Sequence, residues 1–198
     1  MSKGLFSDGV YYCEHIKEAD VDELASFSVR KGAYGLEDYI KNYAWNDELK
    51  NVMRTYIVRD EDSDEIVGYF SIKAGMVSLN EHKRIDEKTG EERVYFDTMP
   101  GVEIADFAVN EAYKEKNGDV KGLGVLIFHD FIYKIVKETA VNLGIRFLYI
   151  FALPYKSLIN QYSMFYHFSR LADDSEKRLH KRLKPEYDDK CIFMYQVL

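Results

Sequence analysis

Apolar residues along the chain fall into short β-rich runs and longer stretches of helical spacing. The β-rich runs predict strands at 10–14, 55–58, 66–72, 102–109, 146–153 and 192–197. Helical spacing predicts helices over 20–27, 36–44, 125–143 and 157–168. The order β-α-α-β-β-β-α-β-α-β predicts an α/β fold with one mixed central sheet of about six to seven strands, flanked by helices.

Local signals set the expected ends of these elements. Asp20, with Glu23 three residues later, is typical of a helix N-cap and capping box, and Ser157 is a second N-cap candidate. Gly144 is typical of the glycine that follows a helix. Residues 110–121 are polar and predict a loop between the strand at 102–109 and the long helix.

The chain is expected to form one domain over 1–198. It has only 3 prolines and no Ser/Gly-rich linker. Residues 80–100 are polar around the turn Lys88-Thr89-Gly90-Glu91, so they predict a protruding β-excursion or a mobile loop.

Composition narrows the class of protein. With 46% hydrophobic and 31% charged residues the chain is globular and not intrinsically disordered. A net charge of −7 disfavours tight non-specific binding to nucleic acid. The sequence has no apolar run long enough to span a membrane and no N-terminal signal segment, so a cytoplasmic protein is expected.

Cysteine and histidine usage indicates neither a disulfide framework nor a metal site. Cys13 and Cys191 lie near opposite ends of the chain and are expected to be reduced, buried thiols. The five histidines lack the spacing of metal ligands, and no metal is predicted.

A glycine pair before the long helix is the first candidate site. Lys121-Gly122-Leu123-Gly124 follows a strand and a polar loop, a layout that points free N–H groups and a positive helix end at phosphate. Neither a Walker motif nor a full dinucleotide fingerprint is present. An ordinary loop-to-helix turn is the alternative interpretation.

Two carboxylates on the strand at 102–109 are candidate bases. Glu103 shares its face with Ala105, Phe107 and Val109, and a carboxylate held among apolar side chains can act as a general base. Taken alone, Glu103 is more often a surface residue at a strand start. Asp106 lies on the other face, where a buried structural role is equally consistent with its position.

Two further features come from the C-terminal part. The hydroxyl of Tyr166, in Phe165-Tyr166, can protonate a leaving thiolate, although most helix tyrosines are packing residues. Residues 177–184 form a basic run that could contact RNA or phosphate. Acidic residues flank the run, which favours a solvated, internally neutralised helix.

The order and spacing of these motifs resemble the GNAT (Gcn5-related N-acetyltransferase) superfamily along nearly the whole chain. Ile66–Tyr69 resembles the third strand of the family and Glu103–Val109 the fourth, with a glutamate where the histone-acetylating branch keeps its base. Lys121–Gly124 resembles the end of the pyrophosphate-binding motif. Phe165-Tyr166 resembles the Phe-Tyr pair of the family, whose tyrosine commonly acts as general acid.

The resemblance implies acetyl-CoA as cosubstrate and direct transfer of its acetyl group to a primary amine. The residues that it implies for binding acetyl-CoA are Phe107, Ala108, Val109, Lys121, Gly122, Leu123, Gly124 and Asn160. It implies that Glu103 removes a proton from the ammonium group and that Tyr166 protonates the departing thiolate. An amine with a pKa of about 10 is mostly protonated at pH 7, which is why a base is needed.

The acceptor amine is less defined. A small-molecule or protein amine is the main expectation, and a homodimer is the quaternary state suggested by analogy with the family. Gly35–Ile40, Thr55–Val58 and Gly68–Ile72 are similar to GNAT toxins that acetylate aminoacyl-tRNA, but the net charge of −7 makes tRNA the alternative partner.

Three positions depart from the family pattern. Asp119 stands where the family prefers Gln or Arg, the loop 110–121 is longer than usual, and Arg170-Leu171 replaces the usual Gly-Phe. The anionic Asp119 motivates a third hypothesis, a non-catalytic CoA-binding module with the same fold.

Overall fold

The computed structural model of the protein describes residues 4–118, 120–183 and 190–198. The chain divides into two compact units, each built from two segments of sequence. Unit 1 contains the described residues of Met1–Lys73 and Ile104–Glu138, and unit 2 those of Ala74–Glu103 and Thr139–Leu198. Two long strands, β4 (Ile66–Ile85) and β5 (Glu92–Val109), contribute to both units.

Unit 1 is built on an antiparallel sheet. Strand β2 (Tyr11–His15) pairs with β1 (Phe6–Ser7) on one side and with β3 (Arg54–Asp60) on the other. Strand β3 then pairs with the first part of β4, from Arg54↔Ile72 to Arg59↔Ile66. This pairing confirms the hairpin predicted from the two apolar runs.

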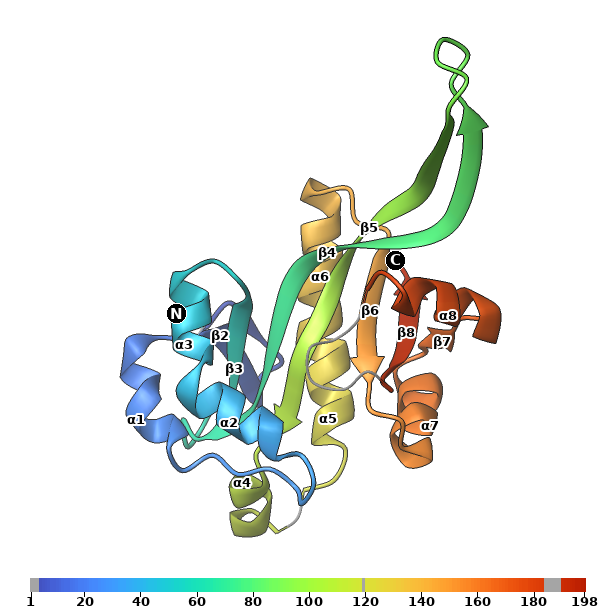
Figure 1. The fold of residues 1–198 in the computed structure, drawn as a ribbon. Helices are drawn as coiled ribbons and strands as arrows, with labels where there is room; N and C mark the ends of the chain where they lie inside the picture. Colours follow the sequence, from blue (N-terminus) through green and yellow to red (C-terminus); the bar gives the residue numbers. More distant parts are fainter. Residues whose placement is uncertain (1–3, 119, 184–189) are drawn as a thin grey trace. The chain divides into compact units, whose positions relative to one another are not determined.

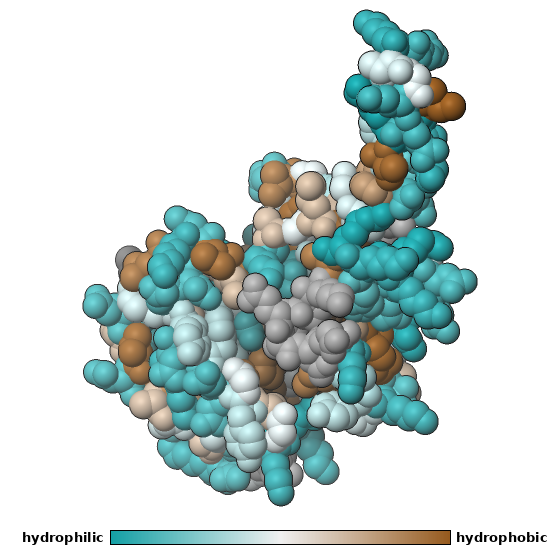
Figure 2. Space-filling model, viewed as in Figure 1, coloured by the Kyte–Doolittle hydropathy of each residue, from teal (hydrophilic) through white to brown (hydrophobic). Residues whose placement is uncertain are grey.

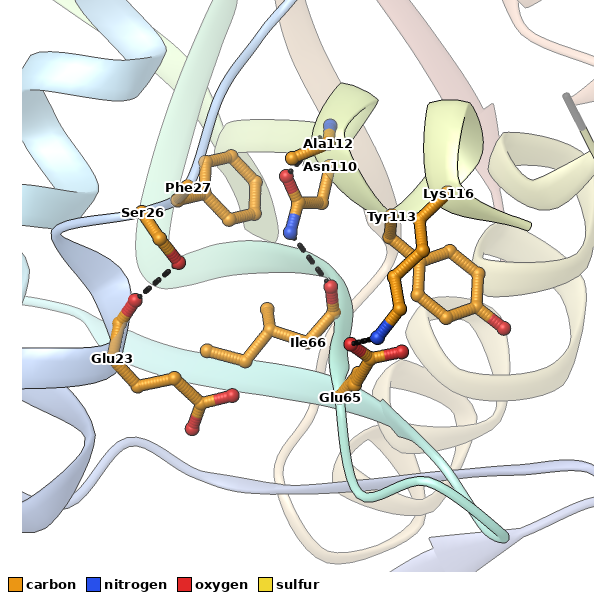
Figure 3. A pocket seen from close by; sticks show the side chains of 9 residues that line it. All are labelled: Glu23, Ser26, Phe27, Glu65, Ile66, Asn110, Ala112, Tyr113 and Lys116. Atoms are coloured by element: carbon orange, nitrogen blue, oxygen red, sulfur yellow. Dashed lines mark hydrogen bonds and ion pairs between the residues drawn. The ribbon is translucent and has the colours of Figure 1, made fainter. Parts of the chain in front are cut away.

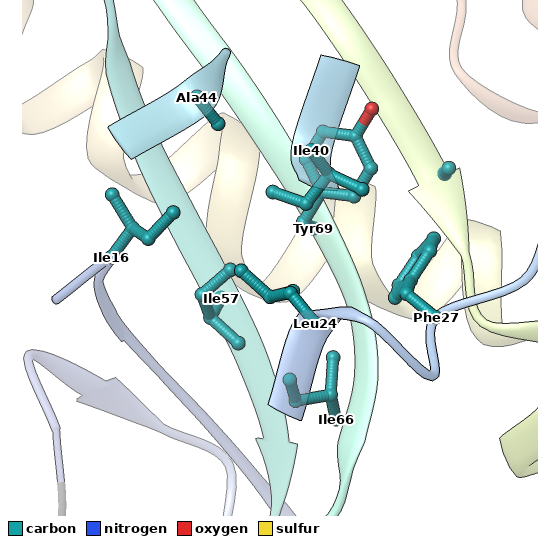
Figure 4. Packing of buried hydrophobic residues seen from close by; sticks show 9 residues of the cluster. Ile16, Leu24, Phe27, Ile40, Ala44, Ile57, Ile66 and Tyr69 are labelled. Carbon is teal, nitrogen blue, oxygen red and sulfur yellow. The ribbon is translucent and has the colours of Figure 1, made fainter. Parts of the chain in front are cut away.

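Short helices supply the apolar side chains that cover this sheet. They are the 3-10 turn η1 (Glu18–Asp20), α1 (Val21–Leu24), α2 (Tyr34–Asn42) and α3 (Ala44–Leu49). Figure 4 shows their side chains packed against residues of β3 and β4. The buried cluster comprises Ile16, Leu24, Phe27, Ile40, Ala44, Ile57, Ile66, Tyr69 and Ala108.

The long C-terminal helix of unit 1 has a π-helical centre. The helical run consists of α5 (Leu123–Leu126), the π segment η2 (Ile127–Ile132) and α6 (Tyr133–Asn142). Residues Ile127, Phe128, Phe131 and Ile132 of the π segment are all buried. The run packs close to the sheet at Gly68, where an added Cβ would lie 2.7 Å from the Ala108 carbonyl and 2.8 Å from Ile127 Cδ1. Only glycine fits there without a shift.

Unit 2 contains the remaining strands. Strand β6 (Phe147–Ala152) is parallel to β5 at Gly101↔Phe147 through Glu103↔Tyr149, and antiparallel to β8 (Ile192–Val197). The short strand β7 (Ser169–Arg170) pairs with β8. All six residues of β6 are buried, as predicted for a central strand.

Two helices of unit 2, α7 (Lys156–Phe165) and α8 (Asp173–His180), complete the described elements. Helix α8 is anchored through Glu176, whose carboxylate accepts hydrogen bonds from the Phe193 N–H (3.0 Å) and Arg170 Nη2 (3.1 Å). Leu179 of the same helix packs into a cluster with Val77, Tyr149, Phe151, Cys191 and Phe193.

The predicted excursion at 80–100 is a β-hairpin. Strand β4 continues to Ile85, and β5 begins at Glu92 (Figure 1). The turn between the strands is closed by Asp86, which accepts from Gly90 N–H and donates to Glu91 O. Residues 74–100 are called the arm below.

The fold class is the predicted one, with more strands. Hydrogen bonding joins eight described strands in the order β1-β2-β3-β4-β5-β6-β8-β7. The two additional strands, β1 and β7, have only two residues each, too few for an alternating pattern.

Several predicted helix boundaries were wrong. Asp20 does stand at the N-cap position of α1, but its carboxylate makes no capping hydrogen bond there; it accepts from Lys17 N–H and pairs with Arg59 instead. Helix α1 ends at Leu24. Gly144 is not in the left-handed conformation, and the helix already ends at Asn142.

Helix α7 also begins and ends earlier than Ser157 and Phe168, the predicted limits. Ser157 lies inside the helix, Tyr155 is its N-cap, and Tyr166 is its C-cap. His167 follows in the left-handed conformation (φ 57°), which terminates the helix.

The predicted loop at 110–121 contains a helix, α4 (Glu111–Lys116). Asn110 is its N-cap, with the side chain accepting from Ala112 N–H at 3.2 Å. Lys114 and Lys116 in the last turn stabilise the helix, because their positive charges lie at the negative end of the helix dipole. Asp119 lies outside the described residues.

Candidate active site

The glycine pair adopts the geometry expected of an anion-binding turn. Gly122 has φ +80° and is the N-cap of α5, and an added Cβ there would meet nothing within 4 Å. The first helical hydrogen bond of this run joins Leu126 N–H to Gly122 O. The N–H groups of residues 123–125 therefore have no acceptor within the helix, as at every helix start. Lys121 is exposed beside them, and the first turn holds no acidic residue. These features fit a bound diphosphate.

The strand segment that leads to this turn has one edge directed away from β4. Asn110 N–H donates to Val67 O of β4 at 2.8 Å. Because backbone groups alternate along a strand, Ala108 faces β4 as well, and the peptide groups of Phe107 and Val109 point to the other edge. The ladder that β5 forms with β6 covers only Gly101–Glu103. The outer edge of β5 at residues 107 and 109 therefore lies beyond this ladder, where the resemblance implies that acetyl-CoA pairs with the strand.

Glu103 is buried in unit 2, which excludes the alternative of a surface glutamate. Its exposed fraction is 7%. It interacts with the hydroxyl of Tyr149, and burial together with this hydrogen bond and the charge of Glu103 raises the pKa of Tyr149. Tyr149 therefore stays a neutral donor to the carboxylate.

Two glycines make room for the Tyr149 ring. A Cβ on Gly75 would lie 1.9 Å from the Tyr149 hydroxyl oxygen, and one on Gly101 would lie 3.0 Å from Cε1 of the ring. Tyr149 is thus held against the backbone of β4 and β5, and its hydroxyl has a fixed position relative to Glu103. Tyr149 could not be predicted as a site residue, because nothing in the apolar run of β6 distinguishes one aromatic residue from another.

Tyr166 is buried at the C-terminal end of α7. Its exposed fraction is 2%, and its ring lies edge-on to Tyr162 at 5.4 Å between centroids. The Tyr166 hydroxyl accepts a hydrogen bond from Gln161 Nε2 at 3.1 Å. This donor orients the Tyr166 hydroxyl. Gln161 was also missed, although its position five residues before the tyrosine on the same helix could have been noted.

The other predicted residues lie where their elements place them. Asn160 is exposed on α7, and Phe165 is exposed next to the buried Tyr166. Glu103, Tyr166 and Asn160 belong to unit 2, whereas residues 107–109 and 121–124 belong to unit 1. Asp106 of unit 1 lies near the half-buried Tyr39 and the buried Tyr69; burial and, to a smaller extent, the charge of Asp106 raise the pKa values of both tyrosines.

A separate cavity of about 140 Å³ lies in unit 1 beneath α4 (Figure 3). Its polar side chains already have partners: Lys116 pairs with Glu65, and Asn110 Nδ2 donates to Ile66 O at 2.8 Å. None of the predicted site residues lines it. The cavity is therefore distinct from the predicted acetyl-CoA site.

The described residues contain neither a metal-binding cluster nor a membrane-spanning helix. Within residues 4–118, 120–183 and 190–198, no group of three or more His, Cys, Asp or Glu side chains could hold a metal ion. No helix in the same part of the chain has both the length and the apolar character needed to cross a membrane.

The order of strands, the left-handed glycine before a long helix and the short β5–β6 ladder define the GNAT fold, and comparison with solved structures confirms this class. The crystal structure of AtaTR bound with acetyl-CoA matches with a TM-score of 0.62 at 17% identity, covering 95% of this chain and 94% of that one. AtaT complexed with acetyl-methionyl-tRNAfMet gives 0.59 at 16% identity, covering 92% and 93%. A point mutant of KacT gives 0.57 at 15% identity, covering 95% of each chain. A scan against protein-family models gave no match.

Proposed function

We propose that this protein is an acetyl-CoA-dependent N-acetyltransferase whose acceptor is the α-amino group of an aminoacyl-tRNA. The observation that carries the proposal is the fold match along 92% or more of the chain to AtaT and KacT, including structures solved with acetyl-CoA and with an acetylated aminoacyl-tRNA. This favours the alternative of the sequence analysis over its main expectation of a small-molecule or protein amine.

The local geometry of unit 1 supports the cosubstrate. The N–H groups after Gly122, which have no intrahelical acceptor, and the exposed Lys121 would hold the diphosphate of acetyl-CoA, and the outer edge of β5 at Phe107 and Val109 would pair with its pantetheine arm. Leu123 and Gly124 contribute through their backbone, as the resemblance implied.

The acceptor nitrogen loses two protons, and the leaving sulfur gains one. Glu103 accepts the first proton from the ammonium group of the acceptor, so that the amine nitrogen can form a C–N bond with the acetyl carbon while the C–S bond breaks. Tyr166 gives its proton to the sulfur that leaves, and the second proton of the nitrogen returns through water to the Tyr166 oxygen. Tyr149 holds the Glu103 carboxylate, and Gln161 holds the Tyr166 hydroxyl.

The acceptor determines how much the base contributes. An α-amino group has a pKa of about 8, whereas a lysine amine has a pKa of about 10.4. At pH 8 roughly half of an α-amine is already neutral. Glu103→Gln is therefore expected to reduce turnover much less with an aminoacyl-tRNA than with a lysine-like amine.

An exposed basic face on α8 offers a surface for tRNA despite the net charge of −7. Lys177 and Arg178 are exposed on the last turns of this helix, and Lys181 and Arg182 are exposed directly after its end. Glu176, in the middle of the same helix, is buried against Phe193 and Arg170 and does not belong to that face. The acidic residues Glu186, Asp188 and Asp189 that flank the run lie outside the described residues.

The decisive experiment offers labelled acetyl-CoA and a panel of acceptors to the purified protein. The panel contains charged tRNAs, the same tRNAs uncharged, free amino acids, polyamines and a lysine-rich protein. We expect label only on the charged tRNAs. Label on small amines or on the protein instead would overturn the tRNA acceptor and restore the main expectation.

Two further measurements separate binding from chemistry. Acetyl-CoA at about 100 times its dissociation constant should stabilise the fold by about 2.7 kcal/mol, and an unchanged melting curve would contradict acetyl-CoA binding. Tyr166→Phe should lower turnover and keep this stabilisation. If the wild type binds acetyl-CoA but transfers the acetyl group to no acceptor in the panel, the hypothesis of a non-catalytic CoA-binding module is supported instead.

The tRNA surface is tested by charge reversal. The double variant Arg178→Glu/Lys181→Glu should raise the KM for charged tRNA and flatten its dependence on salt, because phosphate contacts are lost. Lys134→Glu/Lys137→Glu, two exposed reversals on α6 with the same total change of charge, is the matched control. Equal effects of the two variants would exclude a specific role for α8.

A further inference from the structure

The arm has two outer edges without a paired strand. Pairing of β3 with β4 stops at Ile72, and pairing of β6 with β5 starts at Gly101. Within the described residues, the outer edges of β4 beyond Ile72 and of β5 before Gly101 therefore lack a neighbouring strand. Unpaired N–H and C=O groups along such an edge are a template for another strand.

The two edges differ in chemistry. Strand β4 carries three successive basic residues, His82-Lys83-Arg84, and charged residues protect an edge from strand addition. Strand β5 carries Val94-Tyr95-Phe96, whose exposed fractions are 45%, 48% and 37%. Figure 2 shows hydrophobic surface along the arm. The edge of β5 is therefore the one suited to a partner.

We propose that the β5 edge of the arm pairs with the same edge of a second copy of this chain, antiparallel and two-fold symmetric about Tyr95. In this register each residue faces the one for which the two sequence numbers add to 190. Residue 93 faces 97, residue 94 faces 96, and Tyr95 faces its own copy. The proposal is independent of the acetyltransferase activity.

This register is complementary on both faces of the ribbon. On one face Arg93 of each copy lies opposite Asp97 of the other, on either side of the Tyr95 pair. On the other face Val94 lies opposite Phe96, an aliphatic–aromatic pair. Opposite charges and apolar pairs across antiparallel strands stabilise a sheet, whereas like charges directly opposite destabilise it.

Contacts within the arm hold these side chains ready. Arg93 Nη2 pairs with Asp86 at 2.8 Å. Asp97 uses Oδ2 to accept from His82 (2.8 Å) and Asn80 (3.4 Å), and neither of these contacts involves Oδ1. Arg182 lies over the Phe96 ring at 3.5 Å and bonds Glu81 at 2.9 Å, which fixes the base of the ribbon. An ordered edge loses less conformational entropy on pairing than a mobile one.

The two-fold register allows a charge-swap experiment that no other arrangement mimics. Arg93→Asp places two acidic residues opposite each other at both ends of the pair, and Asp97→Arg places two basic residues there. Each single variant should therefore show a dimer dissociation constant about tenfold or more above wild type. An equimolar mixture should dimerise again, because every facing pair then has opposite charges.

Sedimentation equilibrium of wild type, the two variants and their mixture, over a range of concentrations, is the measurement. The double variant Arg93→Asp/Asp97→Arg in one chain should also dimerise, and Lys88→Glu, an exposed reversal in the turn of the same arm, should behave as wild type. Circular dichroism of each variant checks the fold. A wild type that is monomeric at all concentrations, or a dimer that Arg93→Asp leaves intact, would overturn the proposal, as would a mixture that stays monomeric.

Discussion

The part of strand β5 that belongs to unit 2 has opposite environments at its two ends, 92–98 and 101–103. Residues 92–98 are all exposed, whereas Gly101, Val102 and Glu103 are all buried. The exposed end carries Val94, Tyr95 and Phe96, and the buried end carries a carboxylate. Each end thus carries side chains that are unusual for their environment. The exposed end has apolar residues, the buried end has a charged residue, and neither arrangement stabilises the folded unit. Such exceptions are expected at functional sites.

The largest effect is expected where the buried end is tightest. Gly75→Ala would place a Cβ 1.9 Å from the Tyr149 hydroxyl, and the resulting shift should cost about 3 kcal/mol of stability. Urea unfolding measures the loss. The control is the same change in a Tyr149→Phe background, where the nearest ring atom lies 3.0 Å from the added Cβ, so the loss of stability should be smaller. Equal losses in the two backgrounds would mean that the hydroxyl is not the obstacle.

The buried end should also be sensitive to alkaline pH. The pKa of Tyr149 is raised by burial and by Glu103, so the stability contributed by its neutral form is complete below about pH 10, the unfolded value, and is lost as pH rises toward the folded value. The slope is at most about 1.4 kcal/mol per pH unit for one group. Chemical unfolding from pH 9 to 11 should show a shallower decline for Tyr149→Phe than for wild type. A residual decline is expected because burial raises the pKa of Tyr56 to about 12.

An intermediate effect is expected where Arg182, two residues after the end of α8, contacts the exposed end. Arg182→Ala removes the contact with Phe96 and the ion pair with Glu81, which together are worth about 1 kcal/mol. Hydrogen exchange of the arm amides should accelerate, with little change in β6. Lys181→Ala, an exposed neighbour, is the control; faster exchange in both variants would show that Arg182 has no special role.

The smallest effect is expected at the exposed end itself. Val94→Ser should change the free energy of unfolding of the monomer by less than about 0.5 kcal/mol, because the side chain is 45% exposed. Thermal unfolding at a concentration far below that of dimerisation tests this. A loss of more than 1 kcal/mol would place Val94 in the core of the unit and remove the contrast between the two ends.

Much of the fold could be predicted from local pattern. The hairpin of β3 and β4, the central strand β6 and the helical run from Leu123 follow from apolar spacing, because each buries a continuous face. Helix α4 was missed although Asn110 is a good N-cap, since its polar composition is also typical of a loop. The strands β1 and β7 are too short to have a pattern, and only their pairing partners make them strands.

For the candidate site, the sequence determined which groups are available and tertiary structure decided their surroundings. Gly122 could be predicted because a left-handed turn before a helix favours glycine, which is a local requirement. That Glu103 is buried against Tyr149, that Gln161 bonds Tyr166, and that the arm leaves an apolar edge uncovered depend on contacts between residues far apart in sequence or on the absence of a neighbouring strand. A one-dimensional pattern records side-chain chemistry and spacing, but burial and partners arise only when distant segments pack together.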